Sequence, residues 1–354
     1  MAPVSKPRSN ARTLIVGPSW VGDMVMAQSL FKLLRQQRPD SPIDVLAPAW
    51  SRPLTERMPE VDTSIDMPLG HGQLMLGERY RLGKALAQRG YDHAFVLPNS
   101  IKSALVPAFA GIETRTGWRG EMRFGLLNDI RKLDPKRYPL MVERFAALAF
   151  APGAALPEAI PRPDLRASSE ALPALCEQYD LSLDRPVLAL CPGAEFGPAK
   201  QWPAEHYAEV AARAIASGWQ VWLFGSEKDQ PVTAAICDLV PQAERHACYS
   251  LAGRTSLADA IDLMAAAGAV VSNDSGLMHI AAALGLPLVA VYGSTSPGFT
   301  PPLSDRVAVV SEALECQPCF KRECPLGHLR CLRELDSARV LRALADVTSG
   351  AISP

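Results

Sequence analysis

The strongest constraint on the fold is an alternation of short apolar segments with amphipathic segments, which occurs twice along the 354 residues. Short apolar runs predict buried strands, and apolar residues three or four positions apart predict helices. Strands that alternate with helices form parallel sheets covered by helices. The expected strands are 13–16, 43–46, 93–97, 114–118, 187–190, 219–224, 269–272 and 287–292, and the expected helices are 24–37, 78–89, 100–110, 203–217, 230–239, 256–267 and 277–285.

A proline-rich segment near 151–168 separates the two sets and is typical of a linker. A chain of this length is also long for a single core. We therefore expect an α/β protein with two Rossmann-like domains, 1–165 and 166–336, followed by a helix and tail at 337–354 that could pack back on the first domain. Ligands of such sheets bind outside the carboxyl ends of the strands, so we expect the active site in the cleft between the domains.

Charge is distributed unevenly although the net charge is −1. Residues 1–165 carry 22 Lys and Arg against 16 Asp and Glu, and the remaining residues carry 14 against 21. This imbalance indicates that the N-terminal half either contacts an anionic ligand or surface or simply presents a solvated basic face. No nucleic-acid-binding motif accompanies the charge, which disfavours a nucleic-acid partner.

Targeting signals are not evident in the sequence. Residues 1–12 lack an apolar segment of signal-peptide length, and no apolar run is long enough to span a membrane. We therefore expect a cytoplasmic protein, in which the eight cysteines are reduced thiols or metal ligands.

Four of the cysteines are close together in the sequence. Cys316 and Cys319 form a C-x-x-C pair, and Cys324 and Cys331 follow. Four cysteines of this kind fit a structural zinc site, although the later spacings are not those of a standard zinc ribbon. Reduced thiols and disulfides remain alternatives.

The segment Ser272–His279 joins an expected strand to an expected helix. The first N–H groups of a helix have no partner within it and, with the helix dipole, attract anions. Ser275 and Gly276 would allow a diphosphate to approach closely, and Asp274 could accept hydrogen bonds from sugar hydroxyls. The alternative is an ordinary turn in which serine caps the helix.

The segment Gly17–Asp23 follows the first expected strand. Its glycine spacing is similar to that of a P-loop, but Asp23 and Met24 stand where lysine and serine or threonine should follow. A carboxylate here would repel phosphate. Asp23 is therefore a candidate general base at the cleft, and a helix-capping role is the alternative.

Two further loops carry candidate charges. Lys200 follows the strand 187–190 and could stabilise a departing diphosphate in the absence of a metal ion, or could be an ordinary surface lysine. Glu227 and Asp229 follow the strand 219–224, where a carboxylate can bind both hydroxyls of a ribose. Either could instead be a charged residue at a helix start.

Together these motifs resemble the glycosyltransferases that transfer heptose from ADP-heptose to the inner core of lipopolysaccharide, glycosyltransferase family 9. The resemblance extends from residue 12 to about residue 348. It is carried by Gly17–Met24, Ala47–Trp50, Met67–Gly72, Leu97–Ser100, Arg115–Gly120, Leu140–Arg144, Asn273–His279 and Phe299–Pro302.

The resemblance implies a GT-B fold, an N-terminal acceptor domain and a C-terminal donor domain, and a metal-independent transfer that inverts the anomeric centre. The implied acceptor is heptosyl-Kdo2-lipid A, so the protein would contact the inner leaflet of the inner membrane peripherally. Asp23 matches the base, Lys200 the diphosphate lysine, and Asp274 the aspartate that contacts the sugar and this lysine. The other implied donor-binding residues are Ser275, Gly276, Leu277 and His279, with Asp229 preferred to Glu227 at the ribose.

Basic residues near the expected acceptor site are candidates for contact with the anionic acceptor: Lys102, Arg115, Arg119 and Arg123. Three alternatives remain: a heptosyltransferase for another inner-core position, a GT-B sugar-nucleotide epimerase or hydrolase, and a non-catalytic binding module. The cysteine group departs from the simplest members of the family, and no catalytic role follows from it.

Overall fold

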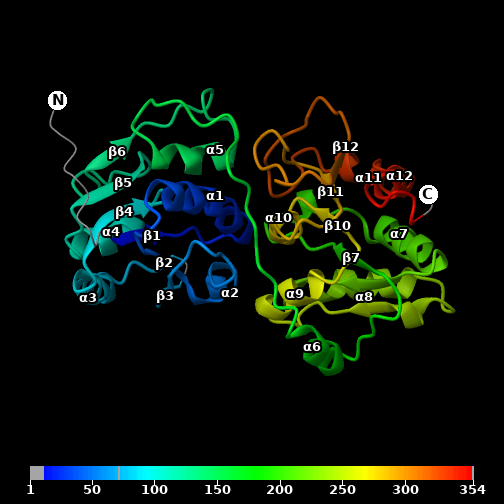
Figure 1. Cartoon of the computed structure of the whole chain (residues 1–354). Coiled ribbons are helices and arrows are strands. Elements are labelled where there is room, and N and C mark those ends of the chain that lie inside the picture. The colour runs from blue at the N-terminus through cyan, green and yellow to red at the C-terminus, as the bar shows by residue number, and fades with distance from the viewer. Residues whose placement is uncertain (1–11, 71, 353–354) are drawn as a thin grey trace. The chain divides into compact units, whose positions relative to one another are not determined.

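The computed structural model describes residues 12–70 and 72–352, and the chain divides after Pro163 into two compact units, Met1–Pro163 and Asp164–Pro354. In the described residues, each unit contains one six-stranded parallel sheet with helices packed on it (Figure 1). The expected α/β class with two Rossmann-like domains is confirmed. None of the described helices has the length and apolar character needed to cross a bilayer.

The sheet of the N-terminal unit has the strand order β3-β2-β1-β4-β5-β6. The chain runs from β1 outward to β3 and then returns to β4 on the other side of β1. The connections that follow β1 and β4 therefore run to opposite sides of the sheet, and this switch point is where such sheets bind ligands. The strands are β1 Arg12–Val16, β2 Ile43–Pro48, β3 Thr63–Met67, β4 Tyr91–Val96, β5 Thr114–Trp118 and β6 Asp129–Arg131.

Helices pack in two groups on this sheet. The first helix packs against the fifth, and the third packs against the fourth (Figure 1). Leu14, Leu46 and Val96 from three neighbouring strands are buried together in its core. The helices are α1 Val21–Gln37, α2 Arg52–Thr55, α3 Leu76–Ala87, α4 Ile101–Phe109 and α5 Met141–Ala146.

The C-terminal unit repeats this plan with the strand order β12-β11-β10-β7-β8-β9. Its switch point lies between β7 and β10, which pair in parallel. The loops that leave these two strands at their carboxyl ends therefore start side by side. The strands are β7 Val187–Cys191, β8 Gln220–Leu223, β9 Cys248–Ser250, β10 Ala269–Asn273, β11 Leu288–Tyr292 and β12 Val307–Ser311.

The last long helix, Ser337–Val347 (α12), packs on the C-terminal unit. It contacts α7 and strands β10, β11 and β12, and its apolar face of Val340, Leu341 and Leu344 is buried in the core of this unit. The helices of the unit are α6 Leu172–Tyr179, α7 Ala204–Ala216, α8 Gln230–Leu239, α9 Leu257–Met264, α10 Gly276–Ala283, α11 Arg330–Arg333 and α12.

Candidate active site

Lys200 and Asp274 meet at the switch point of the C-terminal sheet. Lys200 ends a short 3₁₀ turn, Pro198–Lys200, in the loop that follows β7, and Asp274 follows β10 directly. The lysine Nζ lies 2.6 Å from Oδ2 of Asp274, and both side chains are largely shielded from water, with 14% and 3% of their surface exposed. Charge-assisted hydrogen bonds in such places are short and orient both partners.

A second donor reaches the same carboxylate. The hydroxyl of Thr295, which is buried, donates to Oδ2 of Asp274. The Nζ of Lys200 also lies 4.9 Å from the centre of the Phe196 ring, within cation–π range. These contacts fix the lysine ammonium at the carboxyl edge of the sheet. Thr295 and Phe196 were not among the sequence candidates, although both lie in loops that follow strands.

Asn273 holds the loops of this site in place. Its amide nitrogen donates to the carbonyl of Pro192, 2.7 Å away. Its carbonyl oxygen accepts from the backbone N–H of Trp202 and the hydroxyl of Tyr207. Asn273 is completely buried, so its side-chain amide has no access to water, and these hydrogen bonds satisfy its polar atoms instead. Asn273 therefore positions the segment that carries Lys200.

The amino end of α10 lies next to this pair. Ser275 precedes the helix, and its side chain makes no capping hydrogen bond to the backbone. The first N–H groups of a helix have no partner within the helix, so they are oriented to meet a ligand from the loop side. Ser275, Gly276 and Leu277 are half-buried, which leaves part of this turn accessible.

His279 is part of the same helix but is buried. Burial lowers its pKa to about 4, the nearby carboxylate of Asp274 partly opposes this, and the charge of Lys200 adds to it. The imidazole is therefore neutral near pH 7. A neutral ring beside the lysine avoids a second positive charge in the protein interior.

The structure separates the two candidates for ribose contact. Asp229 is half-buried and accepts hydrogen bonds from the backbone N–H and hydroxyl of Ser226, each 2.8 Å long. Its carboxylate lies against Gly193, where a Cβ would stand 2.5 Å from Oδ2. Glu227 is exposed. Only Asp229 of this pair is therefore held against the loop that follows β7.

Asp23 belongs to the N-terminal unit and lies in the first turn of α1. The loop before it leaves β1 at the switch point of that sheet. Gly17 starts this loop, and a Cβ there would stand 2.6 Å from the tip of the Met24 side chain and 3.2 Å from the Cβ of Ala47, so the loop passes close to β2. Asp23 is half-buried, and a carboxylate near a helix N-terminus interacts favourably with the helix dipole.

The four basic acceptor candidates differ in their surroundings. Arg123 is completely buried and donates to the carbonyls of Pro98 and Trp118, each 2.6 Å away, and burial lowers its pKa to about 10. It is thus a structural residue that ties two loops together. Arg115 donates to the carbonyls of Leu126 and Ile112. Arg119 is exposed and Lys102 is half-buried.

The cysteine group lines one small pocket, together with His328. Backbone N–H groups of the turn after Cys324 lower the pKa of that thiol, and burial raises the pKa of Cys331 to about 11. All eight cysteines are free thiols. Within residues 12–70 and 72–352, no group of three or more His, Cys, Asp or Glu side chains is placed to hold a metal ion. The zinc site thus stays a prediction that this arrangement does not support.

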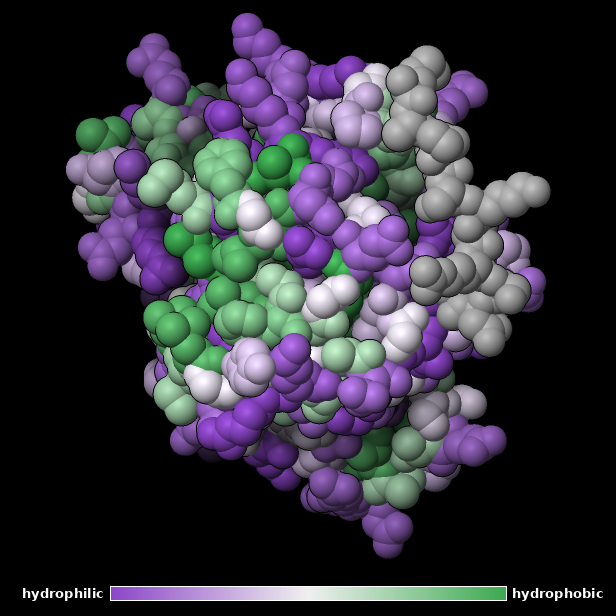
Figure 2. All heavy atoms as spheres, turned by 90° about the vertical axis from the view of Figure 1, so that its left-hand side faces the viewer, coloured by the Kyte–Doolittle hydropathy of each residue, from purple (hydrophilic) through white to green (hydrophobic). Residues whose placement is uncertain are grey.

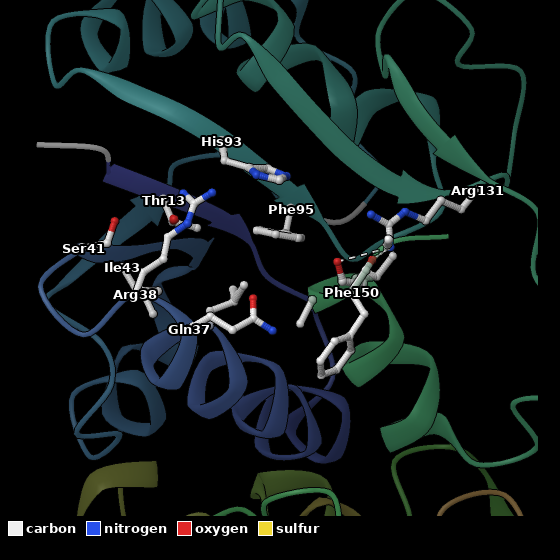
Figure 3. Close-up of a pocket in the computed structure, with 13 residues that line it drawn as sticks. Thr13, Gln37, Arg38, Ser41, Ile43, His93, Phe95, Arg131 and Phe150 are labelled. Carbon is white, nitrogen blue, oxygen red and sulfur yellow. Dashed lines mark hydrogen bonds between the residues drawn. The ribbon is translucent and has the colours of Figure 1, made fainter. Parts of the chain in front are cut away.

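A separate cavity of about 180 Å³ lies in the N-terminal unit (Figure 3). Thr13, Ile43 and His93, which line it, stand near the amino ends of their strands, whereas the loop of Asp23 leaves the carboxyl edge. Arg131, which also lines the cavity, donates to the carbonyls of Ala147 and Phe150 and forms a salt bridge with Asp129. The cavity is therefore not part of the predicted site.

Comparisons with known proteins identify the family of this chain. Residues 79–330 match the family model described as Glycosyltransferase family 9 (heptosyltransferase). The chain is 51% identical over 338 residues to lipopolysaccharide heptosyltransferase 2 of Escherichia coli K12, covering 94% of this chain and 97% of that protein. It is 52% identical over 305 residues to lipooligosaccharide heptosyltransferase 2 of Haemophilus influenzae, covering 84% of this chain and 87% of that protein.

Solved structures are similar over nearly the whole chain. The structure of E. coli ADP-heptose LPS heptosyltransferase II superimposes with a TM-score of 0.87 at 48% identity, covering 96% of this chain and 98% of that one. The family 9 glycosyltransferase from Veillonella parvula has a TM-score of 0.81 at 17% identity, covering 97% of this chain and 99% of that one, and supports the fold alone.

Proposed function

Because the chain belongs to glycosyltransferase family 9, we propose that it transfers L-glycero-D-manno-heptose from ADP-heptose to the first heptose of the lipopolysaccharide inner core. The implied acceptor is heptosyl-Kdo2-lipid A, and ADP is the second product. Similarity to the heptosyltransferase 2 proteins along most of the chain supports this choice of donor and acceptor.

The observation that carries the proposal is the position of Lys200 and Asp274 beside the amino end of α10. A diphosphate leaving group gains negative charge as the bond to the sugar breaks. One ammonium and several backbone N–H groups at a single point can stabilise this charge as it develops. Asp229, held against Gly193, is the carboxylate that would accept hydrogen bonds from the ribose.

Asp23 would accept the proton of the acceptor hydroxyl. The hydroxyl oxygen then forms a bond to C1 of the heptose while the bond from C1 to the diphosphate oxygen breaks. A single displacement of this kind inverts the anomeric centre. Lys102 and Arg119, which are at least partly exposed, are the candidates for binding the anionic acceptor, and no step requires a metal ion.

The test is incubation of the purified protein with ADP-heptose and a one-heptose core acceptor, followed by mass spectrometry. We expect the acceptor to gain one heptose and ADP to appear in equal amount, with or without EDTA. Donor incubated alone provides the control. Free heptose or an isomerised donor in that control, with no acceptor product, would identify a hydrolase or an epimerase instead.

A related activity, transfer to another inner-core position, is distinguished by the linkage of the product. Glycosidic linkage analysis should place the new heptose on the first heptose. We further propose that the enzyme works in the cytoplasm at the surface of the inner membrane, because the lipid A part of this acceptor is embedded in the bilayer.

A further inference from the structure

Exposed apolar side chains gather at one edge of the N-terminal unit. They lie in or just after the loops that follow β3, β4 and β5, and because these strands are parallel, the loops leave the same edge of the sheet. Single exposed apolar residues are ordinary, but a group of large ones at one place marks an interaction surface. We call this group the apolar rim: Leu74, Met75, Leu76, Tyr80, Ile101, Met122 and Phe124.

Hydrogen bonds join the three segments of the rim into one surface. Arg79, which is buried, donates to the carbonyls of Leu74 and Lys102. The backbone N–H of Ile101 donates to the Glu121 side chain, 2.7 Å away. The segments are thus fixed to one another, although they are far apart in the sequence.

Two side chains of the apolar rim are exposed to water over most of their surface. Met122 is 82% exposed and Phe124 is 64% exposed. Figure 2 looks onto the side of the molecule where α3, α4, β5 and β6 lie in Figure 1, and it shows hydrophobic residues gathered on this face with hydrophilic residues around them. Side chains of this size gain free energy when they leave water.

Basic residues surround the rim. In segments 72–84, 99–103 and 119–125, four lysines and arginines are at least partly exposed, Arg81, Lys84, Lys102 and Arg119, against two acidic residues, Glu78 and Glu121. The ammonium of Lys84 lies 5.5 Å from the Tyr80 ring, so an apolar and a cationic group stand together. At a membrane surface, anionic headgroups cover the hydrocarbon. Basic side chains match the headgroups, and the apolar side chains match the hydrocarbon below them.

We propose that the apolar rim inserts into the headgroup region of an anionic membrane and docks the N-terminal unit on the bilayer. This rests on the proposed function, in which the acceptor is anchored in lipid. The loop of Asp23 leaves the same edge of this sheet. Docking through the rim would therefore present this edge to a sugar that projects from the membrane.

The test is cosedimentation of the full chain with vesicles of phosphatidylethanolamine and phosphatidylglycerol, and with vesicles of phosphatidylcholine. The wild type should bind the anionic vesicles more strongly. The double variant Met122→Ser with Phe124→Ser should bind them at least about tenfold more weakly, since it removes the two most exposed apolar side chains. The matched control is Leu183→Ser with Leu239→Ser, which removes two exposed leucines of the C-terminal unit and should bind like the wild type.

Equal vesicle binding by the rim variant and the wild type would overturn the proposal, as would a wild type that does not bind anionic vesicles. Sedimentation velocity without lipid tests whether a second copy of this chain, and not a membrane, binds the rim. A wild-type dimer that the rim variant loses, without vesicle binding, would make the rim a protein interface instead.

A transfer assay keeps this test separate from the proposed function. With an acceptor stripped of its acyl chains, the rim variant should turn over like the wild type. With the intact acceptor in vesicles, it should be slower by a factor similar to its loss of binding. If neither acceptor gains heptose with the wild type, the proposed function fails, whereas the vesicle-binding result stands by itself.

Discussion

Lys200 and Asp274 are 74 positions apart in the sequence, yet their charged atoms lie 2.6 Å from each other. The contact exists because β7 and β10 are neighbours in the C-terminal sheet and both loops leave at the same edge. An ion pair that is this well shielded orients the ammonium more firmly than a surface pair would.

Replacement of Lys200 by methionine should reduce kcat/KM for the donor about 10²- to 10³-fold, the equivalent of about 3–4 kcal/mol, because the departing diphosphate loses its ammonium. Steady-state kinetics with varied ADP-heptose measures the effect. Lys228→Met is the matched control, since Lys228 lies on the next loop, is exposed and forms a surface salt bridge with Glu195. Similar losses in both variants would contradict the role of Lys200.

Neutralising Asp229 and neutralising Glu227 should have different effects on ADP binding. Asp229→Asn is expected to weaken ADP binding by roughly 1–3 kcal/mol, because a charged hydrogen-bond acceptor for the ribose is lost. Glu227→Gln should leave ADP binding unchanged, since this side chain is exposed. Isothermal titration calorimetry with ADP compares the two. A larger effect at Glu227 would reverse the assignment.

Asp23→Ala should abolish transfer while ADP binding stays near that of the wild type, because the base acts on the acceptor hydroxyl and not on the nucleotide. Single-turnover transfer and ADP titration together make the distinction. Glu78→Gln serves as control, because Glu78 also lies in the first turn of a helix of the same unit. Near-normal turnover by Asp23→Ala would end the assignment of the base.

His279 should make the C-terminal unit sensitive to acid. Its pKa is about 4 in the folded protein because of burial, against about 6.5 in an unfolded chain. The unfolded chain therefore takes up a proton between pH 6.5 and pH 4 that the folded protein does not, so stability falls over this range, by up to roughly 3 kcal/mol from this group. Above pH 6.5 the group contributes no pH dependence.

Calorimetric melting at pH 4.5 and pH 7.5 tests this expectation. The difference in melting temperature between the two conditions should be smaller for His279→Gln than for the wild type. His246→Gln, at an exposed position of the same unit, should behave like the wild type. An unchanged acid sensitivity in His279→Gln would contradict the burial of the imidazole as its cause.

Much of the fold follows from local patterns in the sequence. The central strands β7 and β11 are continuous apolar runs that are completely buried, and β1, β4 and β10 each contain a buried apolar run of at least three residues. The positions of these five strands were predicted closely. The strands β3, β6, β9 and β12 were not predicted. They are the edge strands of the two sheets and are mostly half-buried. Strands β3, β6 and β9 lack a continuous apolar run, which is the signal of a buried strand. Strand β12 does contain such a run, at 307–310, and was missed all the same.

The candidate residues of the site were found from the sequence, because the loops after Val16, Cys191 and Asn273 each follow a strong strand signal. What only the tertiary structure decided was which side chains meet. Thr295 reaches Asp274, Asp229 and not Glu227 rests against Gly193, and Arg123 is buried instead of exposed. These relationships depend on the order of strands in a sheet and on burial. Both arise from contacts between distant segments, which local periodicity and composition do not specify.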